Sequence, residues 1–161
     1  MMRVIDKANE INRRYGNNLD QIADSLGLVI IYEKMTGRMQ EFYVRGSIVI
    51  REDLSLREKR ELIAHAIGHH LFHAGNHLSM QKRIYSFGNY HEKQANVFAA
   101  VLLMPTDELL QLLKAKPRMD EIADYFRVTE ELVRLRLLIW VNFEKSKPRI
   151  QEAQIRQRAA S

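Results

Sequence analysis

The segment LREKRELIAHAIGHHLFH, residues 56–73, predicts a long helix that carries a pair of imidazoles. Ser55 and Glu58 have capping-box spacing at its start, where each side chain bonds the backbone N–H of the other residue. His65 and His69 are four residues apart, so both rings lie on one face of the helix and can reach one ion. The segment therefore predicts a metal-binding helix.

A second helix is predicted over residues 90–103, ending before Pro105, because the residue before a proline disfavours helical geometry. Glu92 lies near its start and is a candidate third ligand. Asn96 lies one turn later on the same face, where it could hold a ligating imidazole by a hydrogen bond. Two imidazoles, one carboxylate and an open water position are typical of catalytic zinc, and manganese is also compatible. A capping role beside Asn89 is the alternative for Glu92.

Ala66 occupies the position at which hydrolytic zinc helices, H-E-x-x-H, carry the glutamate that deprotonates a water molecule. Glu61, one turn before His65, is an alternative base, but its side chain is expected to project a turn away from that water. A solvated face of the helix, or a supporting position behind the ligands, is the expected place for Glu61. The sequence thus predicts metal binding with hydrolysis that is very slow or absent.

The remaining elements predict an α+β fold, in which a small antiparallel three-stranded sheet packs on a mainly helical domain. Apolar periodicity and turn residues place its elements as follows: helices over 3–15 and 19–26, strands over 28–33, 41–44 and 47–51, a helix capped by Thr106, and a helix–turn–helix-like pair over 119–126 and 130–144. We expect one domain over residues 1–144 and a basic polar tail over 145–161.

Composition narrows the function further. The 161-residue chain contains no cysteine, which excludes disulfides and thiolate ligands. Its start lacks a secretory signal pattern and its apolar runs are too short to span a bilayer, so a cytoplasmic protein is the default expectation. Five basic residues and one acid after residue 144 give the tail +4 of the net charge of +5. Nucleic acid is therefore expected to bind weakly at most, through the tail.

The pair at 119–144 offers a DNA-binding regulator as an alternative function. Ala123 and Val133 match buried positions of a DNA-binding helix–turn–helix. However, Arg127 stands where glycine is usual in the turn, and Glu130 and Glu131 open the second helix, where they would repel phosphate. Structural packing is the expected role of this pair.

Residues 56–73 resemble the active-site helix of the ImmA/IrrE family of metallopeptidases, in which a leucine and an alanine precede HELGH. EKQANVFAAVLLMP, residues 92–105, resembles the second family motif, in which a glutamate is the third ligand. The likeness covers roughly residues 19–140. It implies a gluzincin-like, zinc-dependent endopeptidase that binds zinc through His65, His69 and Glu92 and cleaves helix–turn–helix repressors, releasing mobile-element or stress-response genes. It also implies that an extended substrate segment binds at the edge of the sheet.

Ala66 departs from this family pattern, because the family glutamate falls at this position. Two origins fit the departure. An engineered replacement that silences hydrolysis is favoured by the retention of all the other motif residues. A natural pseudopeptidase, or anti-repressor, would instead bind its partner without cleaving it.

Overall fold

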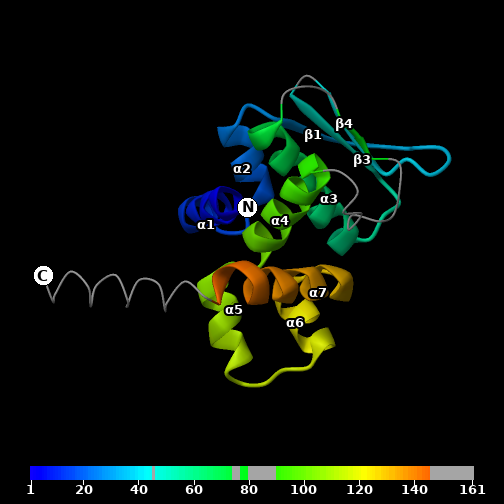
Figure 1. Cartoon of the computed structure of the whole chain (residues 1–161). Helices are drawn as coiled ribbons and strands as arrows, with labels where there is room; N and C mark the ends of the chain where they lie inside the picture. Colours follow the sequence, from blue (N-terminus) through cyan, green and yellow to red (C-terminus); the bar gives the residue numbers. More distant parts are fainter. Residues whose placement is uncertain (45, 74–76, 80–89, 146–161) are drawn as a thin grey trace, which may run out of the picture.

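The computed structural model describes residues 1–44, 46–73, 77–79 and 90–145. In chain order the elements are α1 (Met2–Tyr15), α2 (Leu19–Ser25), β1 (Val29–Glu33), β2 (Glu41–Val44), β3 (Ser47–Arg51), α3 (Leu56–Phe72), β4 (His77–Ser79), α4 (Tyr90–Leu103), α5 (Thr106–Leu113), α6 (Met119–Phe126), α7 (Glu130–Ile139) and the π-helical turn η1 (Trp140–Glu144). Figure 1 shows α3 beside the sheet, and helices α5, α6 and α7 grouped together away from the sheet. The predicted α+β class is confirmed.

The sheet differs in two respects from the predicted three antiparallel strands. Its order is β1-β3-β2-β4, which adds a short fourth strand, and β1 pairs with β3 in parallel. Strand β2 is antiparallel to both of its neighbours. The chain reverses direction twice between β1 and β3, and β3 then lies between β1 and β2, so it runs in the direction of β1. Gly46, at φ 83°, takes a left-handed conformation just before β3 that suits glycine.

Helix α3 packs against the inner face of β2 and β3. On that face Ile48 and Ile50 are fully buried, and Glu41 and Tyr43 are paired opposite them. The capping box at Ser55 and Glu58 forms as predicted. Side chains of a strand alternate between faces, so Glu41 and Tyr43 project toward the same layer as α3.

Helices α3 and α4 approach closely at Gly68. A Cβ atom added there would lie 3.0 Å from Ala95 Cα and 3.2 Å from a ring carbon of Phe98. Contacts this short would require the neighbouring atoms to move before a methyl group could be accommodated, so glycine allows the two backbones to come together. The approach lies one turn from His65 on one helix and close to Glu92 on the other, so it sets the separation of the predicted ligands.

The C-terminal helices are joined to the rest of the chain by a buried charged network. Arg136 is fully buried, and its Nη1 donates to Glu144 Oε1 at 2.7 Å while its Nε donates to the Met104 carbonyl at 2.7 Å.

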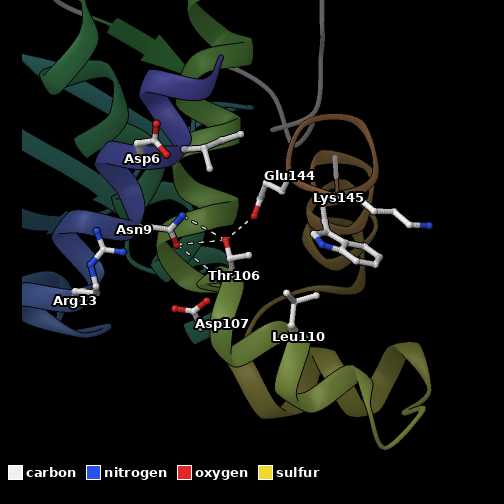
Figure 2. Close-up of a pocket in the computed structure, with 10 residues that line it drawn as sticks. Asp6, Asn9, Arg13, Thr106, Asp107, Leu110, Glu144 and Lys145 are labelled. Carbon is white, nitrogen blue, oxygen red and sulfur yellow. Dashed lines mark hydrogen bonds between the residues drawn. The ribbon is translucent and has the colours of Figure 1, made fainter. Parts of the chain in front are cut away.

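Thr106 links Asn9 of α1 to Glu144, beside a pocket of about 530 Å³ (Figure 2). The prediction that Thr106 caps α5 is wrong, because Pro105 precedes the helix and the Thr106 hydroxyl is used in this network.

Residues 119–126 and 130–139 form the expected helix pair. Arg127 adopts a left-handed conformation at φ 56° in the turn, at the position where glycine is usual. Helix α7 ends at Ile139, and its predicted extension to residue 144 is the π-helical turn η1. Residues 146–161 of the predicted tail lie outside the described residues.

Within the described residues, no single helix has the length and apolar composition needed to cross a bilayer. Helices α4 and α5 have the required length and composition only when they are taken together, and the two are bent by 61° relative to each other.

Candidate metal centre

His65 and His69 lie inside the protein on the face of α3 that meets α4. Their exposed fractions are 2% and 1%, and their Nε2 atoms are 3.0 Å apart. The four-residue spacing explains this proximity, since residues one helical turn apart lie one above the other. Two buried imidazole nitrogens directed at one point form half of a metal-binding donor set.

Glu92 completes this donor set from the first turn of α4. Its Oε2 lies 3.3 Å from His65 Nε2 and its Oε1 lies 3.1 Å from His69 Nε2. One ligand atom from each of the three residues falls within 4.8 Å of the other two. The structure therefore brings together the three candidate ligands that the sequence singled out. The alternative capping role of Glu92 is not tested, because Asn89 lies outside the described residues.

The electrostatics of the centre suit a cation. Hydrogen bonds to His65 and then to His69 hold the pKa of Glu92 well below its usual value, although partial burial opposes this effect. Burial lowers the pKa of His69, which favours its neutral form. A neutral imidazole and an ionised carboxylate are the protonation states that coordinate a divalent ion. The residues present thus fit the metal that the site implies.

Asn96 is fully buried one turn beyond Glu92, and neither of its amide atoms has a hydrogen-bond partner in the described part of the chain. The Nδ1 atom of His65 is likewise unpartnered there. Metal-ligating histidines almost always donate their second ring N–H to a partner. The supporting role of Asn96 therefore stays a prediction.

Ala66 is fully buried between the two histidines in the sequence, and its side chain ends at a methyl group. Glu61 cannot serve as the replacement base. Its carboxylate accepts hydrogen bonds from the Thr129 backbone N–H at 2.5 Å and the Thr129 hydroxyl at 3.1 Å. These bonds tie α3 to the start of α7. The expectation of a solvated face is also wrong, because Glu61 is 1% exposed.

Glu41 is a further carboxyl group that the sequence analysis missed. It lies on β2, is 0% exposed, and neither of its carboxylate oxygens has a hydrogen-bond partner among the described residues. Burial raises the pKa of Glu41 to about 8, and the charge of Glu92 contributes to the rise. The available signal was strand alternation, which places Glu41 on the inner face with Tyr43.

The fold and the centre define an α+β domain with a candidate metal centre of two histidines and one glutamate, in which Ala66 stands where H-E-x-x-H helices carry a glutamate. The chain belongs to the Peptidase_M78 family, described as the IrrE N-terminal-like domain, whose model matches residues 23–138. It is 36% identical over 134 residues to the phage-like element PBSX protein XkdA of Bacillus subtilis (strain 168). This match covers 81% of the chain and 65% of that relative, so the chain spans about two thirds of its length. The ImmA/IrrE resemblance is confirmed.

Proposed function

We propose that this chain is a metal-dependent endopeptidase domain of the ImmA/IrrE type that acts on a helix–turn–helix repressor. The observation that carries the proposal is the convergence of His65, His69 and Glu92 within 4.8 Å, in a chain of the Peptidase_M78 family. Similarity to a protein of a phage-like element supports a repressor of mobile-element genes as the target.

Zinc is the metal we propose, with manganese compatible with the same ligands. Bound there, it would polarise a peptide carbonyl and lower the pKa of a water molecule. The two buried histidines would hold it from the α3 side. Glu92, whose side chain is 39% exposed, is the ligand nearest to solvent, so we propose that substrate approaches past the first turn of α4.

Strand β4 is the sheet edge that we propose for substrate binding. Among the residues that the structure describes, the sheet ends in β1 on one side and β4 on the other. Strand β4 pairs with β2, whose inner face carries Glu41 and Tyr43, and the Tyr43 hydroxyl bonds His70 of the metal-binding helix at 2.8 Å. An extended repressor segment added to this edge would use main-chain hydrogen bonds.

Ala66 sets the expected rate of hydrolysis. A positioned general base contributes about 10² to 10⁴-fold, so the chain is proposed to cleave its repressor very slowly or not at all. The same observation supports the second candidate function, a pseudopeptidase or anti-repressor that binds the repressor without cleaving it. The codon at position 66 of the natural gene would separate an engineered alanine from a natural one.

The direct test compares the present chain with Ala66→Glu on a purified helix–turn–helix repressor, with products identified by mass spectrometry. We expect Ala66→Glu to cleave at a single bond about 10² to 10⁴ times faster, with zinc affinity unchanged because residue 66 is not a ligand. Repressor binding without cleavage by either protein would support the anti-repressor. If both proteins fail to bind the repressor and fail to cleave it, the proposed target is refuted.

DNA binding by the α6–α7 pair has little support. Arg136 is buried against Glu144 and Met104 and so is not available to phosphate, and Arg134 pairs with Glu130 at 3.1 Å. We therefore propose that contact with nucleic acid is weak and resides in the tail after residue 144.

A further inference from the structure

Glu41 has the features of a residue that serves function rather than stability. It is fully buried, yet within the described residues its two oxygens bond nothing. A buried unpaired carboxyl group destabilises the folded protein, so its presence calls for an explanation. Proteins tolerate such costs at functional sites.

Two contacts indicate which part of α3 Glu41 faces. Glu41, Ile50 and Tyr32 are opposite one another on β2, β3 and β1, and so form one cross-strand row. At the β1 end of this row, Lys59 of α3 lies over the Tyr32 ring. In the next row, the Tyr43 hydroxyl bonds His70. The row of Glu41 thus faces the stretch of α3 between residues 59 and 70, which contains His65, Ala66 and His69.

An interaction with Glu92 agrees with the position of Glu41 on the inner face of the sheet, against α3. The charge of Glu92 acts on Glu41 strongly enough to contribute to its raised pKa. Yet among the described residues the set of ligand atoms that converge within 4.8 Å contains Glu92 and the two histidines and not Glu41. Glu41 therefore faces the helix that carries two of the candidate ligands without belonging to the converging set, which is a position from which a general base can act.

We infer that Glu41 supplies from β2 the proton-accepting carboxyl group that Ala66 fails to supply from α3. The inference rests on the proposed function. Water oxygen bonds to the carbonyl carbon of the peptide, and the released proton passes to the Glu41 carboxylate. Glu41 then gives the proton to the amide nitrogen as the C–N bond breaks, so the products are a carboxylic acid and an amine and Glu41 ends ionised. An opposite charge nearby favours the ionised form of Glu41 in the metal-loaded protein.

The test uses four full-length proteins in the zinc-loaded form: the present chain, Glu41→Gln, Ala66→Glu and the double variant. On a repressor that Ala66→Glu cleaves, we expect the present chain to show slow cleavage. Glu41→Gln should lower its kcat by about 10²-fold with KM unchanged within about twofold. In the Ala66→Glu background the same change should have little effect, because the glutamate at 66 is then the base. Glu41→Asp should retain part of the activity.

Glu61→Gln is the matched control, since Glu61 is equally buried but bonded to Thr129. It should lower the Tm and leave kcat unchanged. For Glu41→Gln we expect the opposite, a rise in the Tm of the metal-free protein by about 4 °C at pH 8. The unfolded chain ionises Glu41 near its ordinary pKa of 4.5, whereas the folded chain holds the proton to about pH 8, so stability is lost as pH rises through that interval. Glutamine cannot ionise and avoids this loss.

Each contrary result has a distinct meaning. Cleavage by Ala66→Glu but none by the present chain overturns the inference and leaves the proposed function standing. An equal loss from Glu41→Gln in both backgrounds, a fall in Tm, or a loss of zinc affinity of about tenfold or more also overturns it, since Glu41 would then be a structural residue or a ligand. No cleavage by any of the four proteins overturns the proposed function as well.

Discussion

Gly68 of α3 lies so close to Ala95 of α4 that a Cβ atom on Gly68 would stand 3.0 Å from Ala95 Cα and 3.2 Å from its carbonyl oxygen. This contact fixes the distance between the helix that carries His65 and His69 and the helix that carries Glu92. The three candidate ligands can therefore converge only because the backbones of α3 and α4 come this close.

Gly68→Ala is therefore expected to destabilise the protein by about 1–3 kcal/mol, because the added methyl group forces α3 and α4 apart. Helix propensity alone predicts the opposite sign, since alanine is favoured over glycine by about 1 kcal/mol in a helix. Urea denaturation measures the change, and zinc titration should show weaker binding. A more stable variant would mean that the two helices tolerate separation.

Alanine replacement of His65, His69 or Glu92 is expected to abolish binding of one zinc ion, because each residue supplies one of three converging donors. Asn96→Ala should weaken binding by about 10–100-fold if its amide supports an imidazole. Competition with a chromophoric chelator measures both effects. Glu10→Gln, on an exposed carboxylate of α1, is the control and should bind zinc normally. Full zinc binding by the alanine variants would refute the centre.

The stability of the metal-free protein should depend on Glu92 at acidic pH. Its pKa is depressed in the folded state, so its contribution is present above the ordinary value of 4.5 and is lost as pH falls through the lower folded value. Glu92→Gln should remove this loss of stability at acidic pH. Thermal unfolding of both proteins from about pH 6 down to about pH 3 measures the difference. Parallel curves for the two proteins would contradict the prediction.

Glu144→Gln should destabilise the protein by about 3–5 kcal/mol, because it leaves the buried Arg136 guanidinium without its ion-pair partner. Replacing both residues, as in Arg136→Met with Glu144→Leu, should recover much of the loss. Chemical denaturation of the single and double variants measures the coupling. Additive effects would show that the two side chains act independently.

Truncation after Glu144 should remove whatever affinity the protein has for duplex DNA, since the residues beyond it carry +4 of its +5 charge. Each neutralised phosphate contributes a log–log salt slope of about −0.9, so five basic residues give a slope of at most about −4 to −5. Binding measured at two salt concentrations tests this. Undiminished binding by the truncated chain would place the contact in the folded domain.

Local sequence patterns determined much of this protein. The capping box and the apolar periodicity predict α3, and the proline rule predicts the end of α4 at Leu103, because caps and helical spacing act between residues near in the chain. The spacing of His65 and His69 likewise places both rings on one face, and the motif beginning at Glu92 indicates the third ligand.

Only the tertiary structure decided the relationships between distant segments. The parallel pairing of β1 with β3 arises because β3 lies between β1 and β2 in the sheet. Glu61 is buried because it accepts hydrogen bonds from Thr129, 68 residues further along the chain. The burial of Glu41 follows from the packing of β2 on α3, whereas the letters EFYV indicate only that Glu41 and Tyr43 share a face. Sequence spacing fixes which side chains share a surface, but burial and electrostatic neighbours arise only when two surfaces meet.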